Sequence, residues 1–131
     1  LAGGSVTDWQ LYDTHYTERF MDTPQENPEG YKITAVMTYA DKYKGLLRIV
    51  HGTSDDNVHM QNSIQLINKL QESKKHFEFM IYPGERHGIG ANSSNKAQHN
   101  RNETYEFYYK NLLNKPMPSV FWDGSSQKRA F

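Results

Sequence analysis

The stretch LLRIVHGTSDDNV, residues 46–58, decides how this chain folds. Its first five residues are mostly apolar and β-branched or leucine, a run of the length and character of a buried strand. The run ends in a polar turn that contains two neighbouring carboxylates, Asp55 and Asp56. A strand followed directly by acidic side chains places those side chains at the strand's carboxyl end.

A second strand is predicted at residues 77–82, FEFMIY, and the turn GERHGI, residues 84–89, follows it. Apolar residues at helical spacing predict a helix over 60–73 between the two strands and a long final helix after the loop at 88–95. Two earlier helices are predicted, one from Trp9 through Phe20 and one over 29–38. The order helix, helix, strand, helix, strand, helix is typical of a parallel sheet with crossover helices, so we predict the α/β class.

The two turns carry residues that suit nucleophilic catalysis. In α/β-hydrolases, an acid and a histidine after successive strands are the last two members of a Ser-Asp-His triad. The imidazole takes the serine proton, and the carboxylate fixes its tautomer. His87 is the candidate base, and Asp55 or Asp56 is the candidate acid. The alternatives are a solvated turn or helix cap for the aspartates and a surface loop position for His87.

The nucleophile of such a triad is absent from this sequence. No serine lies in a Gly-x-Ser-x-Gly frame, and the segment GGSVT at 3–7 lacks the second glycine. We therefore expect the C-terminal portion of an α/β-hydrolase fold, incomplete without upstream sequence. The alternative from another class is an autonomous, non-catalytic α/β domain that serves as an interaction module.

Composition excludes several other functions. The 131 residues hold 15 basic and 15 acidic side chains, so no general attraction to nucleic acid is expected. The absence of cysteine excludes disulfides, thiolate zinc sites and a thiol nucleophile. No apolar stretch has the length of a membrane span, so no membrane contact by this segment is expected. No cofactor or metal is expected either. The residues that could act as metal ligands are spaced in a way that matches no metal motif; they are His51, Asp55, His59 and His87.

The end of the chain differs from the rest. Pro116 and Pro118 break the final helix, and an apolar cluster follows at 120–122. We expect residues 1–114 to be part of a catalytic domain and residues 115–131 to be a loosely packed or disordered tail. Packing of this tail against the domain as an arm is the alternative.

Three motifs together resemble the C-terminal end of the catalytic domain in the prolyl oligopeptidase family. They are WQLYD (9–13) with YTERFM (16–21), HGTSDDNV (51–58) and HGI (87–89). Within the family the chain looks most like the dipeptidyl peptidase IV branch, in a bacterial member. The resemblance covers about residues 6–113. It implies a serine exopeptidase that releases N-terminal dipeptides after a penultimate proline or alanine, and an extracytoplasmic location (periplasmic, secreted or cell-surface).

The resemblance also assigns roles to individual residues. Asp55 becomes the triad acid, His87 the base, and Asn57 the group that binds the substrate carbonyl before the proline. The proline pocket would be lined by Val6, Trp9, Tyr12, Tyr16 and Val58. Without the resemblance, an aromatic stripe at helical spacing is typical of ordinary helix core. The family pattern has an acid where this chain has Arg86. This departure puts in doubt whether the electrostatic field around His87 is the one typical of the family.

Two further expectations follow from the family. The full-length protein would be a homodimer that uses residues 61–73 and 102–113 as self-associating surfaces. The serine, the oxyanion tyrosine and the glutamates that hold the substrate's amino terminus would lie upstream of Leu1. The alternative within the family is another aminopeptidase or acylaminoacyl hydrolase with a different pocket.

Overall fold

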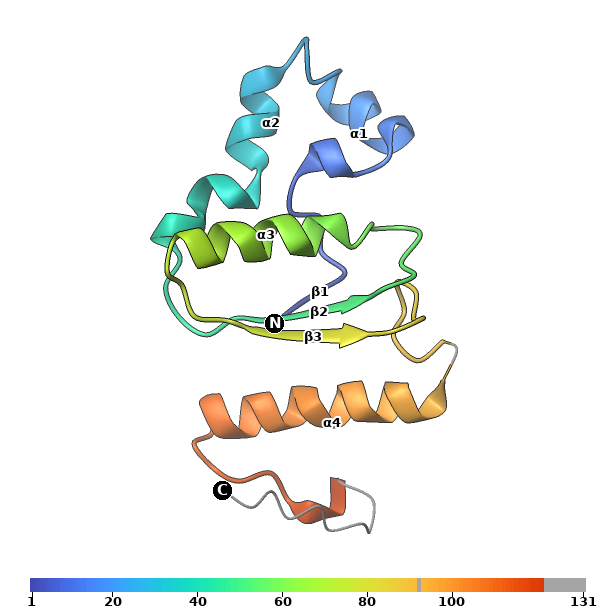
Figure 1. The fold of residues 1–131 in the computed structure, drawn as a ribbon, viewed down its shortest axis with the longest axis vertical. Helices are drawn as coiled ribbons and strands as arrows, with labels where there is room; N and C mark the ends of the chain where they lie inside the picture. The colour runs from blue at the N-terminus through green and yellow to red at the C-terminus, as the bar shows by residue number, and fades with distance from the viewer. Residues whose placement is uncertain (92, 122–131) are drawn as a thin grey trace.

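The computed structural model describes residues 1–91 and 93–121, which form a three-stranded parallel sheet with helices on both sides (Figure 1). The strands β1 (Ala2–Gly3), β2 (Arg48–Gly52) and β3 (Glu78–Tyr82) lie in the order β1-β2-β3. Every residue of the central strand β2 is buried. The two strands predicted from the sequence and the predicted α/β class are confirmed.

The main core lies between the sheet and the crossover helix. Helix α3 (Gln61–Glu72) connects β2 to β3 and covers one face, and α4 (Ser94–Asn111) covers the other (Figure 1). Leu66 and Leu70, one turn apart on α3, pack with Ile49 of β2 and with Ala40. This packing is the reason for the helical apolar spacing in the sequence, and it fixes the direction in which β2 and β3 point.

The predicted helix from Trp9 through Phe20 is wrong, because the chain forms two helices there. They are the 3₁₀ helix η1 (Trp9–Leu11) and α1 (Thr14–Met21). Asp13 has an extended backbone and accepts a hydrogen bond from the Tyr16 amide at 2.8 Å, so it caps α1 and ends the earlier turn. Asp8 caps η1 in the same way, through the Gln10 amide at 2.9 Å.

The next helical region also divides in two. Helix α2 (Pro28–Thr34) begins after the Asn27 cap, as its sequence predicts, but it ends four residues earlier than expected. The chain then continues as the 3₁₀ helix η2 (Val36–Lys42), which packs against α3. Helices α1 and α2 lie beyond α3, on the side away from the sheet (Figure 1).

The segment after α4 folds back along that helix. The 3₁₀ helix η3 (Ser119–Phe121) brings the Phe121 ring to 5.7 Å from that of Tyr105 and 6.4 Å from that of Tyr109. The rest of the predicted tail, with Trp122 of its apolar cluster, lies outside the described residues. Among the helices that the structure describes, none is long and apolar enough to cross a bilayer.

Candidate active site

The loops that follow β2 and β3 are joined into one unit. The Ser54 amide donates to the Glu85 carbonyl at 3.0 Å, and the Gly84 amide donates to Thr53 Oγ1 at 2.8 Å. Gly52, at the end of β2, faces the second loop so closely that a Cβ atom there would lie 2.2 Å from the Glu85 carbonyl oxygen. The acid loop and the histidine loop are therefore held against each other, and their relative position is fixed by backbone contacts.

Asp55 lies at the centre of this unit, with 4% of its surface exposed. Its Oδ1 accepts hydrogen bonds from the amides of Val58 at 2.9 Å and Asn57 at 3.0 Å. Its Oδ2 lies 3.0 Å from His87 Nδ1. Burial alone would raise the pKa of Asp55, but the hydrogen bonds from Val58, His87 and Asn57 and the charge of His87 outweigh it, so the pKa is lowered.

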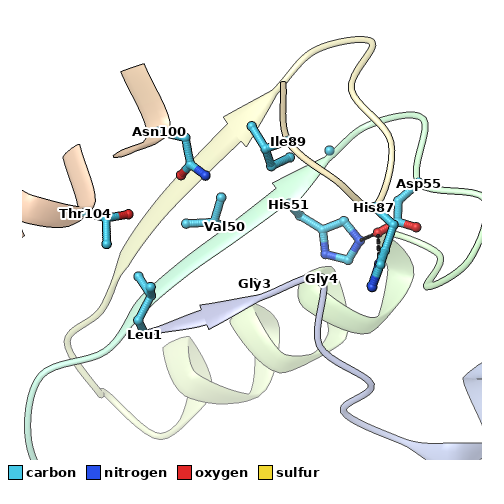
Figure 2. A pocket seen from close by; sticks show the side chains of 11 residues that line it. Leu1, Gly3, Gly4, Val50, His51, Asp55, His87, Ile89, Asn100 and Thr104 are labelled. Atoms are coloured by element: carbon cyan, nitrogen blue, oxygen red, sulfur yellow. Dashed lines mark hydrogen bonds and ion pairs between the residues drawn. The ribbon is translucent and has the colours of Figure 1, made fainter. Parts of the chain in front are cut away.

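His87 is oriented by this contact. Because Nδ1 faces Asp55, the other ring nitrogen, Nε2, points away from the carboxylate (Figure 2). Nearly half of the side chain is exposed, and Nε2 has no hydrogen-bond partner among the described residues. An imidazole bound to a carboxylate through one nitrogen and open at the other can accept a proton from a reacting group.

The second carboxylate of the turn lies elsewhere. Asp56 is exposed and forms an ion pair with Arg86 at 3.2 Å. Asp55 is thus the aspartate that contacts His87, and it also accepts backbone amides of its own turn, as a turn cap would. Arg86, the departure from the family pattern, directs its charge to Asp56.

Two buried polar residues support both loops: Glu85, which the sequence analysis did not single out, and His51, which it considered only as a possible metal ligand. Glu85, 1% exposed, accepts the Gly90 amide at 2.8 Å and lies 3.6 Å from Lys96 of α4, which bridges the loop around His87. His51 of β2 is fully buried beside Asp55. No group of three or more His, Asp or Glu side chains in the described part of the chain is arranged to hold a metal ion.

The predicted pocket aromatics form one cluster, although they come from two helices. The Trp9 ring stacks on Tyr16 at 6.0 Å, and Tyr12 meets Tyr16 edge-on at 5.8 Å. Tyr16 is 49% exposed, so the cluster faces solvent and does not fill the core. The Tyr12 hydroxyl donates to Asn57 Oδ1 at 2.8 Å, which joins the cluster to the acid loop.

The two predicted pocket valines differ in their surroundings. Val6 is half-buried between β1 and η1, whereas Val58 is 4% exposed and turns its amide to Asp55. Val58 therefore has little surface to offer to a ligand. Among the described residues, its clearest interaction is the hydrogen bond from its amide to the Asp55 carboxylate.

A cavity of about 190 Å³ opens beside the Asp55–His87 pair (Figure 2). It lies between the end of β1, which supplies Gly4, and helix α4, which supplies Asn100 and Thr104. None of the three pocket aromatics lines it. Gly4 has a positive φ of 50°, and a Cβ atom there would lie 2.9 Å from His87 Nδ1, so the end of β1 lies directly against the histidine.

The chain is similar to known proteins over most of its length. The model of the prolyl oligopeptidase family matches residues 1–115. A probable dipeptidyl-aminopeptidase B of Coccidioides posadasii is 45% identical over 104 residues, which are 77% of this chain and 11% of the relative. The corresponding protein of Neurospora crassa is 44% identical over 100 residues, 73% of this chain and 11% of the relative.

A solved structure is similar as well. The crystal structure of Porphyromonas gingivalis dipeptidyl peptidase 4 matches with a TM-score of 0.81 and 39% sequence identity. The match covers 85% of this chain and 16% of that one. The chain therefore spans about a tenth to a sixth of the length of the proteins it matches.

Proposed function

The chain belongs to the prolyl oligopeptidase family, and we propose that it supplies the acid and the base of a serine peptidase that releases N-terminal dipeptides. Asp55 is the acid, His87 is the base, and the serine comes from a segment outside these 131 residues. The relatives named as dipeptidyl aminopeptidases support a peptidase function. The absence of a Gly-x-Ser-x-Gly frame supports a serine supplied from elsewhere.

The observation that carries the proposal is the 3.0 Å contact between Asp55 Oδ2 and His87 Nδ1, with Nε2 facing outward. In the reaction, His87 Nε2 takes the proton of the serine hydroxyl as the oxygen attacks the peptide carbonyl. The same nitrogen then gives the proton to the leaving amine, which leaves an acyl-enzyme for water to hydrolyse. Asp55, ionised because its pKa is lowered, stabilises the imidazolium between these steps.

The surroundings of β1 suggest where the serine enters. Among the described strands, β1 has a neighbour on one side, β2, and its end at Gly4 lies against His87. A strand added beside β1 would end near the same point, because the carboxyl ends of parallel strands meet at one edge. We expect the serine in the turn after such a strand.

The aromatic cluster supports a preference for proline at the penultimate position, with alanine as the smaller residue that also fits. A proline ring within a peptide is rigid and apolar and has no N–H to satisfy. Aromatic faces can bury such a ring, at about 25 cal/mol per Å² of apolar area removed from water. The bond from Tyr12 to Asn57 joins this cluster to the acid loop, which supports a proline ring bound close to the candidate acid and base.

Two further expectations from the family remain proposals. Leu112 and Leu113, at the end of α4, are 72% and 55% exposed, and Ile64 of α3 is 47% exposed. These apolar side chains support a homodimer of the whole peptidase through residues 61–73 and 102–113. The extracytoplasmic location stays a prediction.

The test is the substitution His87→Ala in the complete peptidase that contains this segment, assayed with a Gly-Pro anilide. We expect kcat to fall by about 10⁴ to 10⁶, with KM nearly unchanged. His76→Ala, an exposed histidine before β3, is the control and should keep wild-type kcat. Retention of more than about a tenth of kcat by His87→Ala would contradict the proposal, as would hydrolysis by the 131-residue chain alone.

A further inference from the structure

We infer that His51 is a positioning residue, which holds the carboxylate of Asp55 so that its Oδ2 faces His87. The inference rests on the proposed function, because it concerns the same acid and base. His51 belongs to the central strand β2, is 0% exposed, and takes no direct part in the proton transfers described above. Its role would be exerted through Asp55.

The hydrogen bonds of His51 define which ring nitrogen faces the acid loop. Nε2 lies 2.8 Å from the Val58 carbonyl oxygen, and Nδ1 lies 2.7 Å from Ser63 Oγ. A carbonyl oxygen can only accept, so Nε2 carries a hydrogen. The ring thus presents an N–H to the acid loop, and its orientation is fixed from the other side by α3.

The same Nε2 lies 3.3 Å from Asp55 Oδ2. Oδ2 is the oxygen that contacts His87 at 3.0 Å, so it lies between two imidazole rings (Figure 2). The Nε2 hydrogen is directed at the Val58 carbonyl, and Oδ2 lies beside the same N–H. Asp55 is then held at Oδ1 by two backbone amides, one of them from Val58, and its Oδ2 lies between the two rings.

This arrangement matters because Asp55 is almost fully buried and His51 beside it is 0% exposed. A buried carboxylate keeps its charge and its rotamer only where donors surround it. Without the N–H of His51, the loop loses the hydrogen bond that ties Val58 to β2, and Oδ2 loses the polar group that lies beside it. Misplacement of a catalytic group by about 1 Å can cost about 10²-fold in rate.

Two substitutions of His51 by neutral amide side chains distinguish a positioning role from a role in packing alone. In His51→Gln the side-chain amide reaches the place of Nε2, and it can still donate to the Val58 carbonyl beside Asp55. In His51→Asn the shorter side chain reaches only the place of Nδ1, beside Ser63. His76→Gln, at an exposed histidine, is the matched control. All are made in the complete peptidase, and circular dichroism verifies that each is folded.

Two quantities are measured. The first is kcat and KM for a Gly-Pro anilide. The second is the downfield NMR signal of the His87 ring N–H bound to Asp55, assigned by its loss in His87→Ala and recorded without substrate. We expect His51→Asn to lose that signal and to have a kcat about 10²-fold lower than wild type. Its KM should stay within about twofold of wild type. His51→Gln and His76→Gln should keep the signal.

Equal losses in His51→Gln and His51→Asn would overturn the inference, as would an unchanged His87 signal in His51→Asn. If His51→Asn does not fold, Ser63→Ala gives the second comparison. It removes the partner that fixes the His51 ring from α3, so the His87 signal should weaken and kcat should fall, and an unchanged signal with wild-type kcat would overturn the inference. A wild-type protein that shows the signal but hydrolyses no peptide would contradict the proposed function, and the NMR comparison would still decide the role of His51.

Discussion

Tyr12 and Asn57, 45 residues apart in the chain, are joined by a hydrogen bond of 2.8 Å from the Tyr12 hydroxyl to Asn57 Oδ1. Because the side-chain oxygen of Asn57 is occupied, its NH₂ group is left as the donor, and it has no partner among the described residues. The backbone amide of Asn57 meanwhile bonds Asp55. The aromatic cluster, the candidate substrate donor Asn57 and the candidate triad acid Asp55 therefore form one connected unit.

Tyr12→Phe should weaken substrate binding more than catalysis. The ring remains in the cluster, but Asn57 loses the bond that turns its NH₂ group outward. A hydrogen bond of this kind contributes about 0.5–1.5 kcal/mol, so we expect KM for a Gly-Pro anilide to rise by about threefold to tenfold. Steady-state kinetics measure this, and a fall in kcat with unchanged KM would place Tyr12 in a different role.

Asp55→Asn and Asp56→Asn should differ by orders of magnitude. An amide at position 55 favours the wrong tautomer of His87, and the equivalent change in another serine protease costs about 10⁴ in kcat. Asp56→Asn removes an exposed pair with Arg86, and such pairs contribute about 0–1 kcal/mol, so its kcat should stay near wild type. If steady-state kinetics showed the larger loss of kcat in Asp56→Asn, the acid would be Asp56 and not Asp55.

The lowered pKa of Asp55 also predicts how stability depends on pH. In the unfolded chain the pKa of an aspartate is about 3.9. Because the folded pKa lies below that, ionised Asp55 stabilises the fold above about pH 4, and this contribution is lost as the pH falls through the folded value. Asp55→Asn should therefore lower the melting temperature at pH 7, and the difference from wild type should shrink below about pH 4.

Thermal unfolding over a pH series measures this dependence. The matched control is Asp56→Asn, whose exposed side chain should give a small difference from wild type across the series. The difference in melting temperature between Asp55→Asn and wild type could also stay constant from neutral to acid pH. That result would mean that the carboxylate gives no charge-dependent stability.

The sequence predicted that the acidic turn meets the turn with His87 because the reasoning needed only two strands and their direction, whereas the choice of Asp55 over Asp56 came from the family resemblance. Residues 46–50 and 77–82 are apolar enough to be recognised as strands, and in a parallel sheet the turns after them meet at one edge. The spacing of Leu66 and Leu70 predicted α3 for an equally local reason, since both face the core one turn apart.

Features that depend on tertiary contacts were not predictable in this way. Strand β1 has two residues, Ala2 and Gly3, and shows no pattern that would reveal it. The aromatic spacing from Trp9 onward continues across a break at Asp13, so periodicity concealed the cap. His51 looks like part of an apolar strand, and its contacts come from Val58 and Ser63, which reach it only after the turn and α3 have formed.

Gly52→Ala should separate the loop that carries Asp55 from the loop that carries His87. A Cβ atom at this position would lie 2.2 Å from the Glu85 carbonyl oxygen and 2.7 Å from that of Arg86. Both are backbone atoms of the loop that carries His87, so the loop must move as a whole, and its bond from the Ser54 amide is weakened. Overpacking of this kind costs about 1–3 kcal/mol, and displacement of His87 by about 1 Å should lower kcat by about 10².

His76→Ala is the control, because this exposed histidine lies outside both loops. It should keep the wild-type melting temperature and kcat, whereas Gly52→Ala should lower both. Melting curves and steady-state kinetics on the two variants make the comparison. A Gly52→Ala protein with wild-type kcat would show that the loops adjust independently, and the close backbone contact after β2 would then not be what sets the distance from Asp55 to His87.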